Sequence, residues 1–87
     1  MRIENDRAKR EKTLAERGLD FLDAPRVIET AIRSVPDLRF EYGEGRTNTF
    51  GLLEGRVVHV TWTVRDDAIR VISMRYANDR ERAALGR

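Results

Sequence analysis

The side chains best suited to chemistry belong to two apolar segments in the second half of the chain. One segment alternates valines with His59, Thr61 and Thr63, and the next carries Ser73 and Arg75. Such alternation indicates a strand with one buried and one semi-polar face. Guanidinium groups bind phosphate oxygens or carboxylates through paired N–H groups, and hydroxyls position a backbone. The pattern therefore predicts a semi-polar sheet face that can hold a phosphodiester chain.

Cleavage of RNA without a metal makes definite demands on such a face. The ribose 2′-OH attacks the adjacent phosphorus, so the site needs a base, a donor for the leaving oxygen and positive charge. His59 can act as acid or base, Glu44 as a second base, and Arg75 or Arg65 as the stabilising cation.

Each assignment has a structural alternative. His59 lies between valines, which is typical of a half-buried sheet residue. Trp62 alternates with valines, which favours a core position over a base-stacking one. Arg70 and Arg75 have opposite strand parity, so they lie on opposite faces and one is structural unless a bulge intervenes. Plain solvation also explains the charges of the basic first helix.

Composition excludes several classes of protein. The 87 residues form one domain, 1–87, with 40% hydrophobic and 37% charged residues and a net charge of +2. With no cysteine and one histidine, we expect no disulfide, metal site or cofactor. No stretch has the length of a membrane span, and no nucleotide-binding or hydrolase motif is present. We therefore expect a soluble, cytoplasmic protein without membrane contact.

The patterns predict an α+β fold, with two helices, an antiparallel sheet of about four strands and a short C-terminal helix. Residues 6–17 read as a helix capped by Asn5 or Asp6 and ended by Gly18. A second helix is expected over residues 21–29. The further expected elements are an opening strand or tail at "MRI", a strand over 30–35, a loop over 37–46, three strands over 47–76 joined at "EGR" and "RDDA", and a helix from the Asn78–Glu81 capping box to about residue 85.

Motifs along most of the chain resemble one family. The motif "R-[IV]-I-S-x-R-x-A" followed by "E-R" is the most specific of them. With the other matching positions, it resembles the BrnT-type toxins, RelE-like proteins of bacterial type II toxin–antitoxin pairs. The positions that carry the resemblance are Asp6, Lys9, Gly18, Phe21, Glu44, Arg46, Gly51, Arg70, Val71, Ile72, Ser73, Arg75, Ala77, Glu81 and Arg82.

The resemblance implies a metal-independent endoribonuclease that inhibits translation. It also implies a BrnA-like, DNA-binding antitoxin that neutralises the toxin in a hetero-oligomer. That complex represses its own operon, and operator DNA is contacted only through the antitoxin. The implied RelE-like fold places two N-terminal helices on an antiparallel sheet with a C-terminal helix.

The chain departs from the family pattern at the end of the first helix. The family usually shows Lys-His-Gly, and this chain has Glu16-Arg17-Gly18. An arginine neutralises phosphate but does not shuttle protons at neutral pH. The alternative function is therefore a weakened or inactive homologue that acts as an interaction module for the antitoxin.

Together the residues and the resemblance define two sets of candidate site residues. The catalytic candidates are Arg65, Arg70, Arg75, His59 and Glu44. The RNA-binding candidates are Lys9, Arg17, Arg46, Thr63, Ser73 and Arg80.

Overall fold

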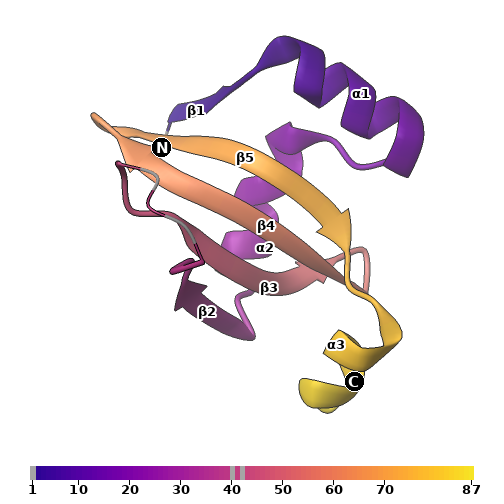
Figure 1. The fold of residues 1–87 in the computed structure, drawn as a ribbon. Helices are drawn as coiled ribbons and strands as arrows, with labels where there is room; N and C mark the ends of the chain where they lie inside the picture. Colours follow the sequence, from indigo (N-terminus) through magenta and orange to yellow (C-terminus); the bar gives the residue numbers. More distant parts are fainter. Residues whose placement is uncertain (1, 40, 42) are drawn as a thin grey trace.

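The computed structural model describes residues 2–39, 41 and 43–87, and it has an α+β fold around one five-stranded sheet (Figure 1). Position 1 of the expected first strand and positions 40 and 42 of the expected loop lie outside the described residues. The strands are β1 (Arg2–Asn5), β2 (Arg33–Pro36), β3 (Thr47–Leu53), β4 (Arg56–Arg65) and β5 (Ala68–Tyr76). The helices are α1 (Arg7–Arg17), the 3-10 helix η1 (Phe21–Asp23), α2 (Ala24–Glu29) and α3 (Asp79–Ala84).

The sheet is mixed, with strand order β1-β5-β4-β3-β2. The expected antiparallel sheet of about four strands is wrong in one respect, because β1 is a fifth strand that pairs parallel to β5. This pairing joins the first strand to the last, from Arg2 opposite Ala68 to Asn5 opposite Val71. Local alternation over four residues gives no information about so distant a partner.

The ends of α1 follow the predicted capping chemistry. The Asp6 carboxylate accepts a hydrogen bond from the Lys9 backbone N–H, and Gly18 ends the helix with φ 69°. The predicted second helix is divided, because the turn capped by Asp20 is a 3-10 helix before α2 begins. The capping box at the start of α3 is confirmed. No described helix is long and apolar enough to cross a membrane.

The strand expected over residues 30–35 begins later, at Arg33, and includes Pro36. Thr30 instead closes α2, since its hydroxyl accepts from the Leu52 N–H and lies within hydrogen-bonding distance of two α2 carbonyls and of the Leu52 carbonyl in β3. Proline is tolerated in β2 because this strand forms an edge of the sheet.

The core lies between one sheet face and the segment that contains η1 and α2, which Figure 1 shows behind the sheet. Gly51 allows the close approach of α2 to β3, because a Cβ there would lie 1.9 Å from the Val27 carbonyl oxygen. Trp62 is half-buried against the core, as predicted, and its indole N–H donates to Thr49. The buried core residues are Leu19, Phe21, Ala24, Val27, Leu53, Val58, Val60, Ile69, Val71 and Met74.

Val64 departs from the predicted alternation. It shares the parity of the core-facing valines, yet it is 59% exposed. The alternation rule places it inward, but Val64 lies near the end of β4 and is not among the described residues that pack against the core. The buried face of β4 is therefore shorter than the sequence predicts.

Candidate functional site

A β-bulge in β5 assembles the candidate site. Thr61 pairs with Ser73 but Trp62 pairs with Val71, so Ile72 is an extra residue on β5. The bulge shifts the strand parity between Arg70 and Arg75, and both arginines are paired with residues of one face of β4. The expectation that they lie on opposite faces is therefore wrong. We call this surface the polar face; its members are Asn48, His59, Thr61, Thr63, Arg70, Ser73 and Arg75.

One end of the polar face, near the β4–β5 turn, is accessible. We call it the open end and define it by Glu44, Thr63, Arg65 and Arg70. A side-chain N–H of Arg65 lies 3.4 Å from a Glu44 carboxylate oxygen, and both side chains are partly exposed. Thr63 donates to the Gly45 carbonyl. Arg70 is half-buried opposite Thr63 and has no hydrogen-bond or ion-pair partner among the described residues.

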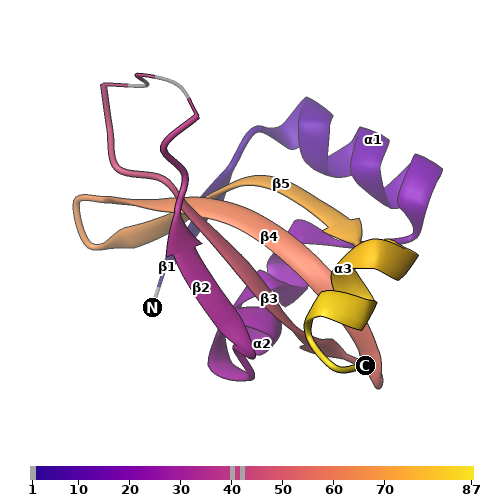
Figure 2. The ribbon, with the colours of Figure 1, turned by 60° about the horizontal axis from the view of Figure 1, so that its bottom comes forward.

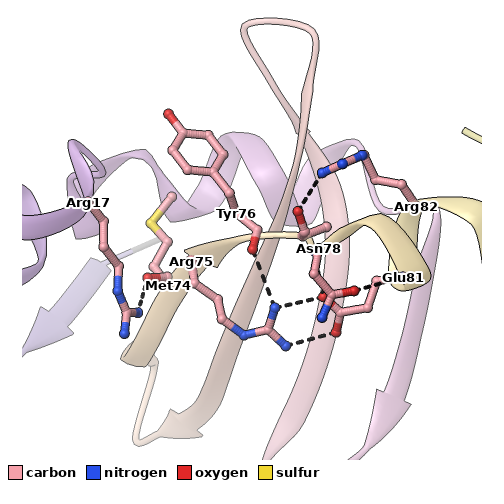
Figure 3. A network of polar contacts seen from close by, with 8 residues as sticks. Arg17, Met74, Arg75, Tyr76, Asn78, Glu81 and Arg82 are labelled. Carbon is pink, nitrogen blue, oxygen red and sulfur yellow. Dashed lines mark hydrogen bonds and ion pairs between the residues drawn. The ribbon is translucent and has the colours of Figure 1, made fainter.

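The other end of the polar face, beside α3, is occupied by an ion pair. We call it the closed end and define it by His59, Arg75 and Glu81. The Arg75 guanidinium donates to both Glu81 carboxylate oxygens, at 2.7 and 2.8 Å (Figure 3). Mainly through this hydrogen bonding, the pair lowers the pKa of Glu81 to about 2 and raises the pKa of Arg75. The guanidinium is thus already neutralised by a carboxylate of its own chain.

His59 is enclosed at the closed end. Only 8% of the residue is exposed, and its ring makes an edge contact with Phe50, with 4.9 Å between centroids. Burial, and then the charge of Arg75, lower the pKa of His59 to about 4. Its Nδ1 atom is buried without a hydrogen-bond partner among the described residues. In this conformation the ring is neutral at pH 7 and has no direct path to RNA.

Two described residues of the loop between β2 and β3 contact the polar face: Asp37 is hydrogen-bonded to Asn48, and Gly45 accepts from Thr63. Asp37 is buried and accepts two hydrogen bonds from the Arg39 guanidinium, at 3.0 and 2.9 Å. These bonds hold the pKa of Asp37 well below its usual range. Thr61 donates to Asn48 beneath the loop, and Arg46 of the loop is half-buried and engaged in interactions. Figure 2 shows the loop rising on the side of the sheet where β4 and β5 turn.

The RNA-binding candidates of α1 lie at the free edge of β5, beyond the part that pairs with β1. Lys9, Arg17 and Ser73 line one groove of about 230 Å³. The Arg17 guanidinium donates to the Met74 carbonyl at 2.9 Å (Figure 3), so it already satisfies an edge-strand acceptor. Lys12 also lines this groove and was not predicted, although its spacing of three residues from Lys9 places both on one helix face.

The structure therefore gathers four candidates at the open end (Glu44, Thr63, Arg65 and Arg70) and places the others at the closed end, in the loop, beside α1 or on α3. Arg80 is exposed on α3 and has no partner among the described residues. Within the same residues, no group of three histidine, cysteine, aspartate or glutamate side chains is arranged to hold a metal ion.

Comparison with known proteins identifies the family. No curated protein matches the chain. A family model described as the ribonuclease toxin BrnT of type II toxin–antitoxin systems matches residues 6–81. That span includes α1, every residue of the polar face, and Glu81. The chain belongs to the BrnT family of ribonuclease toxins, a family that implies an antitoxin partner.

Proposed function

We propose that this chain is a metal-independent endoribonuclease toxin of RelE-like fold that cleaves RNA at the open end of the polar face. Cleavage inhibits translation in the bacterial cytoplasm. A BrnA-like antitoxin neutralises the toxin in a hetero-oligomer, and that complex represses its own operon through the antitoxin's DNA contacts.

The open end supports a cleavage step by the ribose 2′-OH. Arg70 binds the scissile phosphate and stabilises the charge that develops on its oxygens, and Arg65 adds a second cation. The Glu44 carboxylate takes the 2′-OH proton as the 2′-oxygen forms its bond to phosphorus. The bond from phosphorus to the 5′-oxygen breaks, the leaving oxygen takes a proton from solvent, and the products are a 2′,3′-cyclic phosphate and a 5′-OH. Ser73 orients the backbone, whereas Thr63 is buried, and its hydroxyl holds the Gly45 carbonyl beside Arg70.

The observation that carries this assignment is that the Arg70 guanidinium has no partner in the described part of the chain. Arg75 is neutralised by Glu81, and Arg17 donates to the Met74 carbonyl. Arg65 contacts Glu44 only through an exposed 3.4 Å pair, and such pairs contribute little and open easily. Arg70 alone of these arginines has no partner among the described residues, and it lies beside a hydroxyl on the polar face.

Arg70→Ala tests the assignment directly. We expect the rate of RNA cleavage by the purified chain to fall at least about 100-fold, because a stabilising donor of the transition state is lost. Arg80→Ala is the matched control, since Arg80 also has no partner among the described residues but is an exposed residue of α3. Circular dichroism establishes that both variants fold. Undiminished cleavage by folded Arg70→Ala, or an equal loss in Arg80→Ala, removes Arg70 from the site.

A second function is favoured by the contacts of Arg17. The family's histidine position carries this arginine, and its guanidinium is held by a backbone carbonyl rather than facing a substrate. A toxin homologue that binds the antitoxin without cutting RNA fits this contact. Expression of the chain alone in a bacterial host separates the two functions. Growth arrest with RNA cleavage supports the enzyme, whereas normal growth with folded protein present supports the interaction module.

A further inference from the structure

A second basic surface lies outside the polar face, at the opposite end of β4. A groove of about 530 Å³ there is bordered by the β3–β4 turn, the end of β5 and the C-terminal segment. We call it the arginine groove. Three arginines and three apolar or aromatic side chains line it, and no aspartate or glutamate is among the described lining residues: Arg56, Arg82, Arg87, Leu52, Val57 and Tyr76. Neither the catalytic nor the RNA-binding candidates include any of these residues.

Arg56 is prepared to bind a carboxylate. Its guanidinium carbon lies 3.6 Å from the centroid of the Tyr76 ring. Stacking uses the flat face of the guanidinium, so the N–H donors in its plane still point outward. The ring also limits the orientations of a long side chain, which lowers the entropy lost on binding. Figure 3 shows the Tyr76 ring turned away from the Arg75–Glu81 pair, and Arg56 has no hydrogen bond or ion pair with Glu81 among the described residues.

Arg82 and Arg87, the other two arginines of the groove, differ in whether a carboxylate neutralises their charge. Arg82 donates to the Ala77 carbonyl and pairs with Asp79, so its charge is partly neutralised. Arg87 and Arg56 have no carboxylate partner among the described residues. The groove therefore has an excess of positive charge over an apolar floor.

We propose that the arginine groove binds an acidic peptide segment with alternating apolar side chains, supplied by the antitoxin. The carboxylates would pair with Arg56 and Arg87, while an apolar side chain packs on Leu52 and Val57. RNA fits the groove less well, because bases bind by stacking on aromatic faces and Arg56 already covers Tyr76. The antitoxin as source rests on the proposed function, whereas the peptide chemistry rests on the groove alone.

The test is an NMR titration of the isotopically labelled chain with synthetic probes. The probes are a hexapeptide of alternating leucine and glutamate, the same peptide with glutamine for glutamate, and a hexauridylate RNA. We expect the acidic peptide to shift the signals of Gly55, Tyr76 and Arg87, and the glutamine peptide to bind at least tenfold more weakly. Arg56→Gln should weaken the acidic peptide about tenfold. Arg33→Gln, at an exposed arginine of β2, should not change its affinity.

The outcomes separate this proposal from the RNA site. No shifts in the groove with the acidic peptide, equal binding of the glutamine peptide, or stronger shifts there with RNA would each overturn the proposal. RNA cleavage by Arg56→Gln should equal that of the unchanged chain. If both proposals hold, the Arg70→Ala variant loses RNA cleavage but still binds the acidic peptide. The results that would contradict the RNA site therefore differ from the results that would contradict peptide binding in the arginine groove.

Discussion

The two ends of the polar face contain the same kinds of charged group and use them differently. They are separated by four residues of β4, or roughly 13 Å at the usual rise of an extended strand. At the closed end, Arg75 and Glu81 form a bidentate pair that fastens α3 to β5. At the open end, Arg65 and Glu44 make one long, exposed contact. An Arg–Glu pair is therefore no functional signal by itself; burial and geometry decide whether it stabilises the fold or remains available to a substrate.

The largest effect expected at the closed end is a dependence of stability on pH through His59. Its pKa of about 4 in the folded chain is below the unfolded value of 6.5. Above pH 6.5 both states are neutral at this ring and its contribution is fully present. As pH falls from 6.5 to 4, the unfolded chain binds a proton that the folded chain does not, so about 3 kcal/mol of stability is lost.

The measurement is urea unfolding at pH 7.5, 5.5 and 4, beside an NMR titration of the ring. The chain has one histidine, so its signal is unambiguous. In His59→Asn the slope of stability between pH 6.5 and about 4.5 should flatten. A titration midpoint near 6.5 would show that the ring is open to solvent and that the two ends do not differ as described.

A smaller effect is expected from Glu81→Gln. Glutamine can keep the capping box, because its side-chain oxygen still accepts from the Asn78 backbone N–H, but it removes the charge that faces Arg75. Since both side chains are partly exposed, we expect a loss of about 1 kcal/mol in the free energy of unfolding, measured with urea at pH 7.

Asp79→Asn is the matched control on the same helix. Asp79 is almost fully exposed and contacts Arg82, so the change should be within about 0.5 kcal/mol. The pKa of Glu81 is lowered, so the stability it contributes is present above pH 4.5 and lost as pH falls toward 2. Equal losses in the two variants would show that the Arg75–Glu81 pair does not hold α3.

The contrast also explains how far the sequence could predict the molecule. The caps at Asp6 and Asn78 and the end at Gly18 depend on contacts within four residues, and sequence spacing predicts them correctly. The bulge at Ile72 cannot be predicted from sequence spacing, because it depends on how β5 fits both β4 and β1. Simple parity therefore placed Arg70 on the wrong face.

The burial of the polar face could not be predicted from the sequence either. Alternation marked His59, Thr61 and Thr63 as one semi-polar face, but it could not show that each is less than 10% exposed. The loop that carries Asp37 contacts this face, and its glycines and mixed charge indicated only irregular structure. Long-range ion pairs and loop placement depend on the assembled fold, so sequence spacing does not contain them.

The smallest expected change in stability belongs to the open end, where the effect on activity is large. Glu44→Gln breaks only the exposed contact with Arg65, so the free energy of unfolding should change by no more than about 0.5 kcal/mol. The rate of RNA cleavage should fall about 100-fold, because the proposed base for the 2′-OH is removed. Asp67→Asn is the matched control, since Asp67 is an exposed acid of the adjacent β4–β5 turn and pairs with Arg2 instead. Urea unfolding and a cleavage assay on the same preparations measure both quantities. If Glu44→Gln destabilises the chain as much as Glu81→Gln and leaves cleavage unchanged, the two ends have the same structural role and the catalytic base lies elsewhere.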